Sequence, residues 1–166
     1  MESARAATAA DLDLIASLWS RAVAELDGQR GGMLLAGNLY RPDPQKALNS
    51  AFDDIDRFLV IGDIEGVPVG FASVYCDRER REPVGVVEIV YVEPPARQVG
   101  VAESMIKLVM EWSAERGCVG VDAPALPGSR SAKAFFEDNG FVARLLVMHH
   151  PLDRESAGGD GAGGDD

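Results

Sequence analysis

The segment 90–106 combines a strand-like run with the start of a helix, which is an arrangement suited to binding phosphate. The apolar run 90–92 ends near a pair of prolines, and Gly100 and Ala102 then lead into a long amphipathic pattern. A helix N-terminus presents unpaired backbone N–H groups and the positive end of the helix dipole. Gly100 and Ala102 carry almost no side chain, so an anion can approach the backbone closely there. The pattern predicts a site for a phosphorylated ligand.

Glu88 is the candidate for moving a proton. It is the one charged residue in the otherwise apolar run Val84–Val92, and an apolar setting makes a carboxylate a better general base. The alternative is a Glu88 that points to solvent or makes a structural hydrogen bond. Three further residues are rival bases, namely His149 and His150, which are adjacent on an expected last strand, and Asp122, which lies in another strand.

Two blocks of the chain resemble the GNAT superfamily of N-acetyltransferases. Arg97, Gly100 and Ala102 fill the family's acetyl-CoA signature, Arg/Gln-x-x-Gly-x-Gly/Ala. Downstream, the block 132–141 is similar to the family's Ala-x-x-x-Tyr-Glu-Lys-x-Gly-Phe. The resemblance spans roughly residues 3–152 and implies the GNAT acyl-CoA N-acyltransferase fold. In that fold the fourth and fifth strands splay apart, and the pantetheine arm of CoA lies in the gap.

The resemblance also implies the roles of individual residues. Acetyl-CoA would be the co-substrate, with no metal, and the amine would attack the thioester directly. The N–H group of Val92 would polarise the thioester carbonyl as an oxyanion donor. The expected cofactor contacts are Val90, Tyr91 and Val92 for pantetheine, the backbone of Arg97, Gln98, Val99, Gly100, Val101 and Ala102 for the pyrophosphate, and Ser129 and Phe136.

Two positions depart from the family pattern. Phe136 stands where the family usually has the tyrosine that protonates the departing thiolate, and Ser129 stands where asparagine is common. Phenylalanine has no proton to give. Releasing a free thiolate with a pKa near 8.5 at pH 7 costs about 2 kcal/mol, which slows the reaction without forbidding it. Tyr91, Tyr40, Tyr75 or a water would have to take the place of the missing acid.

Periodicity and turn signals predict the elements that position these residues. Helices are expected from a Thr8 cap to about Asp27 and over Pro44–Asp54, Gln98–Arg116 and Ser129–Asp138, with a loop at Gly28–Arg41. Strands are expected at Ser3–Thr8, Arg57–Asp63, Val67–Cys76, Val84–Val92, Cys118–Ala123 and Phe141–Pro151. The order β-α-α-β-β-β-α-β-α-β predicts an α/β (α+β) fold with a mixed sheet and helices on both faces. Residues 1–152 form one domain, followed by a Gly-rich acidic tail at 153–166, which we expect to be disordered.

The amino-acid composition limits the kinds of molecule that the protein is expected to bind. The 166 residues carry a net charge of −11, of which the tail contributes −4 and residues 1–152 contribute −7. This balance disfavours nucleic acid, whose binding relies on Lys and Arg, and mildly favours a cationic amine. No run is apolar enough to span a membrane. The two histidines and two cysteines are not clustered at metal-ligand spacing, no P-loop motif occurs, and free cysteines without a signal peptide favour the cytoplasm.

The sequence therefore predicts an acetyl-CoA-dependent N-acetyltransferase that acts on a primary amine of a small molecule or of a protein or peptide. The alternative is a catalytically silent GNAT domain that binds acyl-CoA as a sensor or partner module. The loop 29–35 is the expected acceptor region, where Arg30 could meet a substrate carboxylate. The acceptor and the oligomeric state, a homodimer included, are left open.

Overall fold

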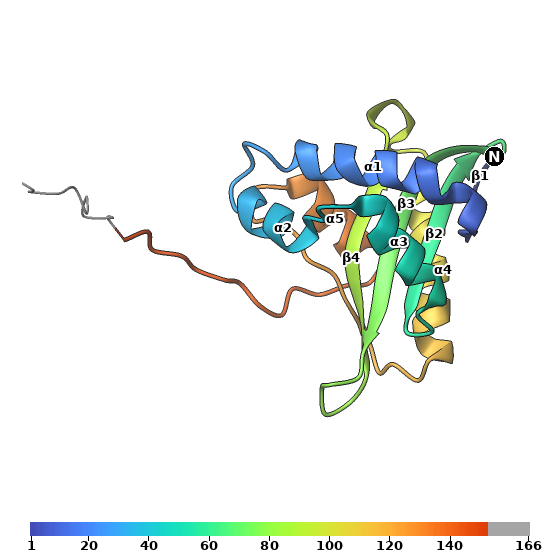
Figure 1. The fold of residues 1–166 in the computed structure, drawn as a ribbon. Coiled ribbons are helices and arrows are strands. Elements are labelled where there is room, and N and C mark those ends of the chain that lie inside the picture. Colours follow the sequence, from blue (N-terminus) through green and yellow to red (C-terminus); the bar gives the residue numbers. More distant parts are fainter. Residues whose placement is uncertain (153–166) are drawn as a thin grey trace, which may run out of the picture.

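A five-stranded mixed sheet forms the centre of the protein (Figure 1). The structure is a computed structural model that describes residues 1–152, so the predicted tail lies outside the described residues. The strands follow one another in space in chain order, and the last pair alone is parallel. They are β1 (Glu2–Ala6), β2 (Arg57–Ile64), β3 (Val67–Asp77), β4 (Val84–Val92) and β5 (Val121–Asp122). The predicted fold class is confirmed.

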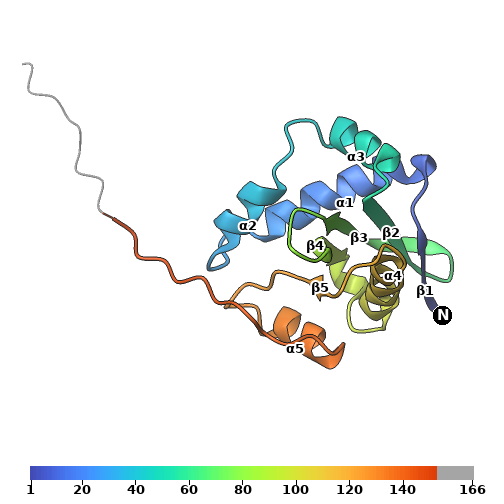
Figure 2. The same ribbon diagram turned by 90° about the horizontal axis from the view of Figure 1, so that it is seen from below.

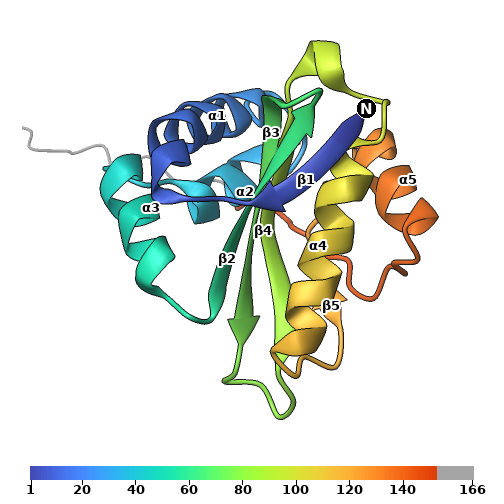
Figure 3. The same ribbon diagram turned by 90° about the vertical axis from the view of Figure 1, so that its right-hand side faces the viewer.

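Helices cover both faces of this sheet, as predicted (Figure 3). The helices are α1 (Leu12–Glu25), α2 (Gly32–Leu39), α3 (Pro44–Asp53), α4 (Val101–Glu115) and α5 (Arg130–Asp138). The first apolar core joins α1, α2 and α3 to one face and includes Ile15, Leu18, Leu48, Ile61 and Phe71. The second joins α4 to the other face and includes Val60, Val74, Val87, Met105 and Val109. Along a strand, successive side chains point to opposite faces of the sheet. Neighbouring residues therefore contribute in turn to the first core and to the second.

Helix α2 lies inside the segment 28–41 that the sequence predicts as a loop, so that expectation is wrong. Gly31, at φ 80°, turns the chain into the helix. At the other end, the indole Nε1 of Trp19 donates a 2.9 Å hydrogen bond to the carbonyl of Leu39. A buried tryptophan therefore satisfies one of the carbonyls left free at a helix C-terminus. This stabilising contact joins residues 20 apart in sequence, which local propensity cannot predict.

The predicted last strand, 141–151, is absent, and the element order differs there from the prediction. The segment pairs its backbone with no strand among residues 1–152. The strand predicted at 118–123 is also shorter, with Val121 and Asp122 paired to β4. A strand needs a neighbour to pair its backbone, and β5 has none on its outer edge within the described residues. The mostly apolar segment 141–151 is thus left without a strand partner among residues 1–152.

A charged cluster fixes the junction between β1 and α1. Asp11 accepts two hydrogen bonds of 2.8 Å from Arg5 and one of 2.8 Å from the backbone N–H of Thr8. The predicted capping box at Thr8 and Asp11 is therefore present. The hydrogen bonds from Arg5, followed by those from Thr8, hold the pKa of Asp11 well below its usual range.

Replacing Asp11 with Asn should lower the free energy of unfolding at pH 7 by about 2 kcal/mol, because hydrogen bonds to a charged group contribute about 1.5–3 kcal/mol. The lowered pKa means that this contribution is fully present above the unfolded-state value of about 3.9 and is lost as pH falls through the folded-state value. Urea titrations of D11N and the unsubstituted protein from neutral to acidic pH measure the difference. A gap that does not shrink in acid, or a similar loss in the exposed control D27N, would contradict this account.

Candidate active site

The sheet opens between β4 and β5. Strand β5 pairs with β4 at Gly85 and Val86 and at no later residue. From Val87 to Val92, β4 remains paired with β3 on its other edge, while no strand among residues 1–152 lies on the open one. The predicted splaying of these strands is therefore present, and it leaves a row of backbone groups on the open edge of β4.

The alternation of the backbone shows which groups face this gap. Glu93 donates its N–H to the carbonyl of Val69 in β3, at 2.8 Å. Because successive N–H groups in a strand point to opposite edges, the N–H groups of Val92 and Val90 face the open edge. The carbonyl of Val92 lies on that edge too, where it accepts a 2.8 Å hydrogen bond from Nε of Arg97. Of the three predicted pantetheine contacts, Val90 and Val92 thus direct their N–H groups into the gap, whereas the N–H of Tyr91 faces β3.

The chain then turns sharply into α4. Gln98 and Gly100 both have positive φ, at 66° and 93°, and Gly100 is the residue just before the helix. Ser104 is the first residue to donate its N–H back to Gly100, at 3.0 Å. The N–H groups of residues 101–103 therefore have no acceptor within the helix. Sequence reasoning predicted Val101 and Ala102 as anion donors, and the helix geometry adds Glu103.

Arg97 does not present its guanidinium to this helix start. Its Nη2 donates a 2.6 Å hydrogen bond to Glu25 at the end of α1, and the guanidinium lies 5.6 Å from the ring centroid of Tyr91. The hydrogen bond from Arg97 to the Glu25 carboxylate raises the pKa of Arg97. The Arg97 N–H also donates to Pro94, at 3.4 Å. Arg97 thus ties α1 to the end of β4, and the backbone that follows it is the candidate anion site.

Glu88 occupies a β-bulge in β4. Ser73 in β3 pairs with Ile89 and Val74 pairs with Val87, so Glu88 has no partner of its own. A bulge of this kind bends the strand and redirects one side chain. The Glu88 carboxylate consequently reaches the α1 face beside Ser73 rather than the α4 face. The predicted candidate base Glu88 therefore does not point to solvent, and other polar side chains lie beside its carboxylate.

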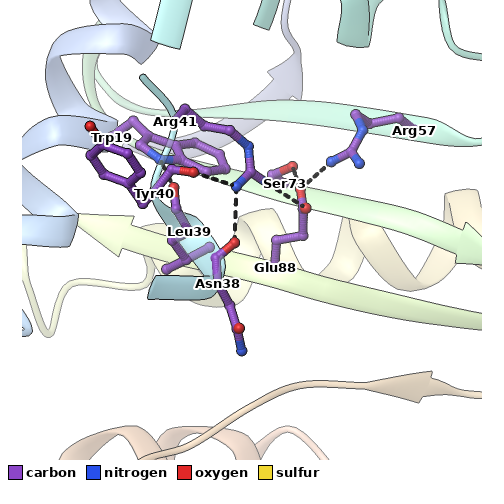
Figure 4. Close-up of polar contacts among 8 residues, drawn as sticks. All are labelled: Trp19, Asn38, Leu39, Tyr40, Arg41, Arg57, Ser73 and Glu88. Atoms are coloured by element: carbon purple, nitrogen blue, oxygen red, sulfur yellow. Dashed lines mark hydrogen bonds and ion pairs between the residues drawn. The ribbon is translucent and has the colours of Figure 1, made fainter. Parts of the chain in front are cut away.

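Both oxygens of Glu88 have partners (Figure 4). Oε2 accepts hydrogen bonds from Ser73, at 2.7 Å, and from Arg57, while Oε1 is 3.4 Å from Arg41. Arg41 itself donates to the carbonyls of Asn38 and Tyr40 at the end of α2. Oε1, with its single long contact, is the oxygen with room for another hydrogen bond. Sequence reasoning missed all three partners, although Ser73 is the one polar residue in the apolar run 69–76.

A cavity of about 250 Å³ adjoins this carboxylate. Trp19, Arg41, Arg57 and Ser73 form the wall that surrounds Glu88, and α3 provides the opposite wall. The ring of Trp19 lies 5.6 Å from the Arg41 guanidinium, which holds that arginine over the cavity. The volume suits one substituted ring rather than a folded peptide segment.

The remaining predicted residues lie outside this cluster. Ser129 caps α5 by accepting the N–H of Ala132 at 3.4 Å. Phe136 packs edge-on against Phe135 and Phe141, with ring centroids 5.1 and 5.2 Å away. The rival bases are also elsewhere, since His149 and His150 are exposed and Asp122 pairs with Arg80 and Arg144, at 2.8 and 2.7 Å. The predicted acceptor residue Arg30 is exposed in the turn before α2.

Two classes of site are not found among the described residues. Within 1–152 no three His, Cys, Asp or Glu side chains come together in a way that could hold a metal ion. Over the same range no helix is long and apolar enough to cross a bilayer.

Comparison with known proteins decides the family. The model of the acetyltransferase (GNAT) family matches residues 22–141. This chain belongs to the GNAT family. The matched range contains the end of α1, the Glu88 cluster, the open edge of β4, the α4 start and α5, while Trp19 of the cavity wall lies just before it. The recognition made from the sequence is confirmed.

Characterised relatives fall in the same group. The chain is 29% identical over 103 residues to aminoglycoside N(6')-acetyltransferase type 1 of Salmonella typhimurium. The alignment covers 59% of this chain and 70% of the relative. The Salmonella enteritidis enzyme gives the same values. Among solved structures, AAC(6')-Iy in complex with a bisubstrate analogue of CoA and acetylneamine superposes with a TM-score of 0.72 at 19% identity, covering 92% of this chain and 99% of that one. The same enzyme with CoA gives 0.71 at 18% identity, covering 92% and 95%. These likenesses confirm the fold.

Replacing Gly100 with Glu should weaken acetyl-CoA binding at least 100-fold. The change places a side chain at φ 93°, sets its Cβ 3.1 Å from Cγ of Glu2, and adds a negative charge beside the phosphate donors. Isothermal titration measures the dissociation constant. G66E is the matched control, since Gly66 also has positive φ, at 80°, but has open space around it. Equal affinity in folded G100E and G66E would remove the α4 start from the site.

Proposed function

We propose that this GNAT-family chain is an acetyl-CoA-dependent N-acetyltransferase whose acceptor is a primary amine of a small molecule. One observation carries the proposal, namely the two sets of free backbone donors, one on the open edge of β4 and one in the first turn of α4. An extended amide-containing arm can pair with the strand edge, and a pyrophosphate can bind the helix start. Phosphopantetheine thiols such as CoA combine these two chemistries in one molecule.

Amino sugars are the first acceptors to test. The characterised relatives act on aminoglycosides according to their names, and such polycationic amines suit a chain whose residues 1–152 carry a net charge of −7. The cavity beside Glu88 has room for a single ring and favours a small molecule over a peptide. A cytoplasmic location, which rests on the two free cysteines, is part of the same proposal.

In the proposed reaction, the N–H of Val92 donates a hydrogen bond to the thioester oxygen and stabilises the charge that develops when the amine attacks. Val92 lies four residues beyond Glu88, which is about 13 Å along an extended strand. Glu88 therefore accepts the proton of the ammonium group at Oε1 through a relay of water molecules. Ser73 and Arg57 hold Oε2 and so fix the direction of the carboxylate.

The leaving thiolate has no side-chain acid at the family's usual position, because Phe136 packs among other aromatic rings. Tyr91 is the nearest tyrosine in sequence to the proposed carbonyl donor, and burial raises its pKa, which keeps its hydroxyl protonated at neutral pH. In this structure Tyr91 faces the α1 core and packs against Phe71. We therefore assign departure of CoA as the free thiolate, which costs about 2 kcal/mol at pH 7 for a thiol pKa near 8.5, and the thiolate then takes up its proton from the solvent.

Two of these observations favour the second candidate function, a silent acyl-CoA-binding module. Phe136 removes the expected acid, and Glu88 is already engaged by three side chains. The two functions share acetyl-CoA binding and differ in turnover. Release of free CoA thiol in the presence of an aminoglycoside panel separates them. Thiol release that requires the amine supports the enzyme, while micromolar binding without release for any amine supports the module.

Replacing Glu88 with Gln should lower kcat about 100-fold or more, because a positioned general base contributes about 10²–10⁴-fold. Glutamine keeps the size of the side chain and can still accept from Ser73 and Arg57, so the KM for acetyl-CoA should change little. Initial rates of thiol release measure both constants. E65Q, which removes a carboxylate from the exposed β2–β3 turn, is the control. Full activity in E88Q would exclude Glu88 as the base.

A further inference from the structure

Two cysteines that the proposed reaction does not use lie in contact at one end of the sheet. The Sγ atoms of Cys76 and Cys118 are 3.2 Å apart, although 42 positions separate the two residues in sequence. Both are free thiols in this structure. Cys76 is the last residue but one of β3, and Cys118 lies between α4 and β5. The sulfur atom pair needs to approach by only about 1.2 Å to reach disulfide bond length.

The backbone holds each of the two cysteines in place. Cys76 pairs with Gly85 of β4, and its N–H donates a 2.7 Å hydrogen bond to the carbonyl of Asp56. The N–H of Cys118 donates a 3.0 Å hydrogen bond to the carbonyl of Ser113 in the last turn of α4, which is a helix-capping contact. The two sulfurs therefore meet because of ordered elements of the fold.

A glycine in β4 allows this meeting, because it lets the end of α4 approach the sheet. Gly85 lies between Cys76 in β3 and Val121 in β5 across the paired strands. A Cβ atom at this glycine would lie 2.6 Å from Oγ of Ser113, so a side chain here would push α4 away. The C-terminal end of α4 and β5 consequently lie side by side (Figures 2 and 3). Cys118, which lies between them in sequence, can thus reach Cys76.

Small molecules have access to the pair. Cys118 is partly exposed, while Cys76 is only 6% exposed. Cys76 nevertheless lines an open cavity of about 460 Å³, whose other walls are Asp56, Tyr75 and residues 77–79. A molecule the size of a peroxide fits this opening, whereas a cysteine of another protein does not reach the buried sulfur. The accessible oxidants are therefore small ones.

The protonation state of Cys118 sets the pace of its chemistry. Burial, followed by the hydrogen bond with Cys76, raises the pKa of the Cys118 thiol to about 11. Because the thiolate is the reactive form of cysteine, the pair reacts slowly at neutral pH. Slow reaction suits a modification that builds up during sustained oxidation.

We propose that Cys76 and Cys118 form a modification site, at which a peroxide converts the two thiols to an intramolecular disulfide that stabilises the fold. Cys118, the more exposed of the two, attacks one oxygen of hydrogen peroxide as the thiolate. The O–O bond breaks, which leaves a sulfenic acid on Cys118 and a hydroxide that takes up the proton lost by this residue. The Cys76 sulfur then attacks the Cys118 sulfur, the S–O bond breaks, and the oxygen leaves as water with the Cys76 proton. The two thiols lose two electrons and two protons in total, and the peroxide becomes two water molecules.

The disulfide would close a loop that contains the candidate cofactor site. Residues 77–117 include all of β4 and α4, so the crosslink ties the chain between α4 and β5 to the end of β3. A crosslink that closes a long loop restricts the unfolded chain and thereby stabilises the folded one. The inference does not depend on the acetyltransferase activity.

Peptide mapping after peroxide treatment tests the site. The full chain is incubated with excess hydrogen peroxide, denatured, alkylated and digested. The expected product is a pair of peptides from one chain joined through Cys76 and Cys118, which a dithiol reductant separates. Thiols that can still be alkylated, separate oxidation of each cysteine to sulfinic acid, or a disulfide found only between two chains would each overturn the proposal.

Thermal unfolding gives a second readout. The oxidised protein should melt about 5 °C or more above the reduced protein, and a dithiol reductant should reverse the rise. C118S is the matched control, because it keeps the buried Cys76 but cannot form the disulfide. The same peroxide treatment of C118S also reports any effect of methionine oxidation. An equal rise in C118S, or no rise in a protein whose disulfide has been mapped, would contradict the proposal.

Discussion

The candidate site depends on β4 losing its partner on one edge. Strand β4 is paired with β3 on both sides of the Glu88 bulge, which holds it in place, while β5 leaves it after Val86. In a regular sheet, the N–H groups on this edge of β4 would be hydrogen-bonded to a neighbouring strand. Here they are held in fixed positions by the rest of the strand and have no strand partner among residues 1–152. Rigid donors that need no reorganisation are the main requirement for stabilising a developing charge. The opening therefore provides both the binding surface for an extended ligand and the donor for its reactive carbonyl.

The bulge at Glu88 connects this opening to the other face of the sheet. The extra residue in β4 shifts the alternation, so that Val87 packs under α4 while Glu88 contacts Ser73, Arg57 and Arg41, which line the cavity beside α1 and α3. One strand thus has its proposed ligand edge toward β5 and a carboxylate behind the wall of the proposed acceptor cavity. The arginines around Glu88 come from the ends of other elements, Arg41 from beyond α2 and Arg57 from the start of β2. Their contacts hold a charged group in a partly buried place, where an unpaired carboxylate would be costly.

The sequence predicted the parts of the fold that local physics determines, and missed those that depend on distant contacts. The helix start at Gly100, the capping box at Thr8 and the hairpin at Glu65-Gly66 all follow from neighbouring residues, and all are present. Helix α2 was missed because its end is satisfied by Trp19, and the partners of Glu88 were missed because three separate segments bring them together. The predicted last strand is rich in apolar residues, but pairing is a property of two strands, and no second strand lies beside it in the described chain. Phe136 packs against Phe135 and Phe141, and its place in the cofactor site stays a prediction.

The most direct test of the open-edge account is an NMR titration of the isotope-labelled protein with acetyl-CoA that follows each backbone amide. The account predicts the largest shifts and new protection from exchange at Val92, Val90 and residues 101–103, with little change at the amides of β1 and β2. Shifts confined to other elements, or no binding at all, would contradict the assignment of this edge as the cofactor site.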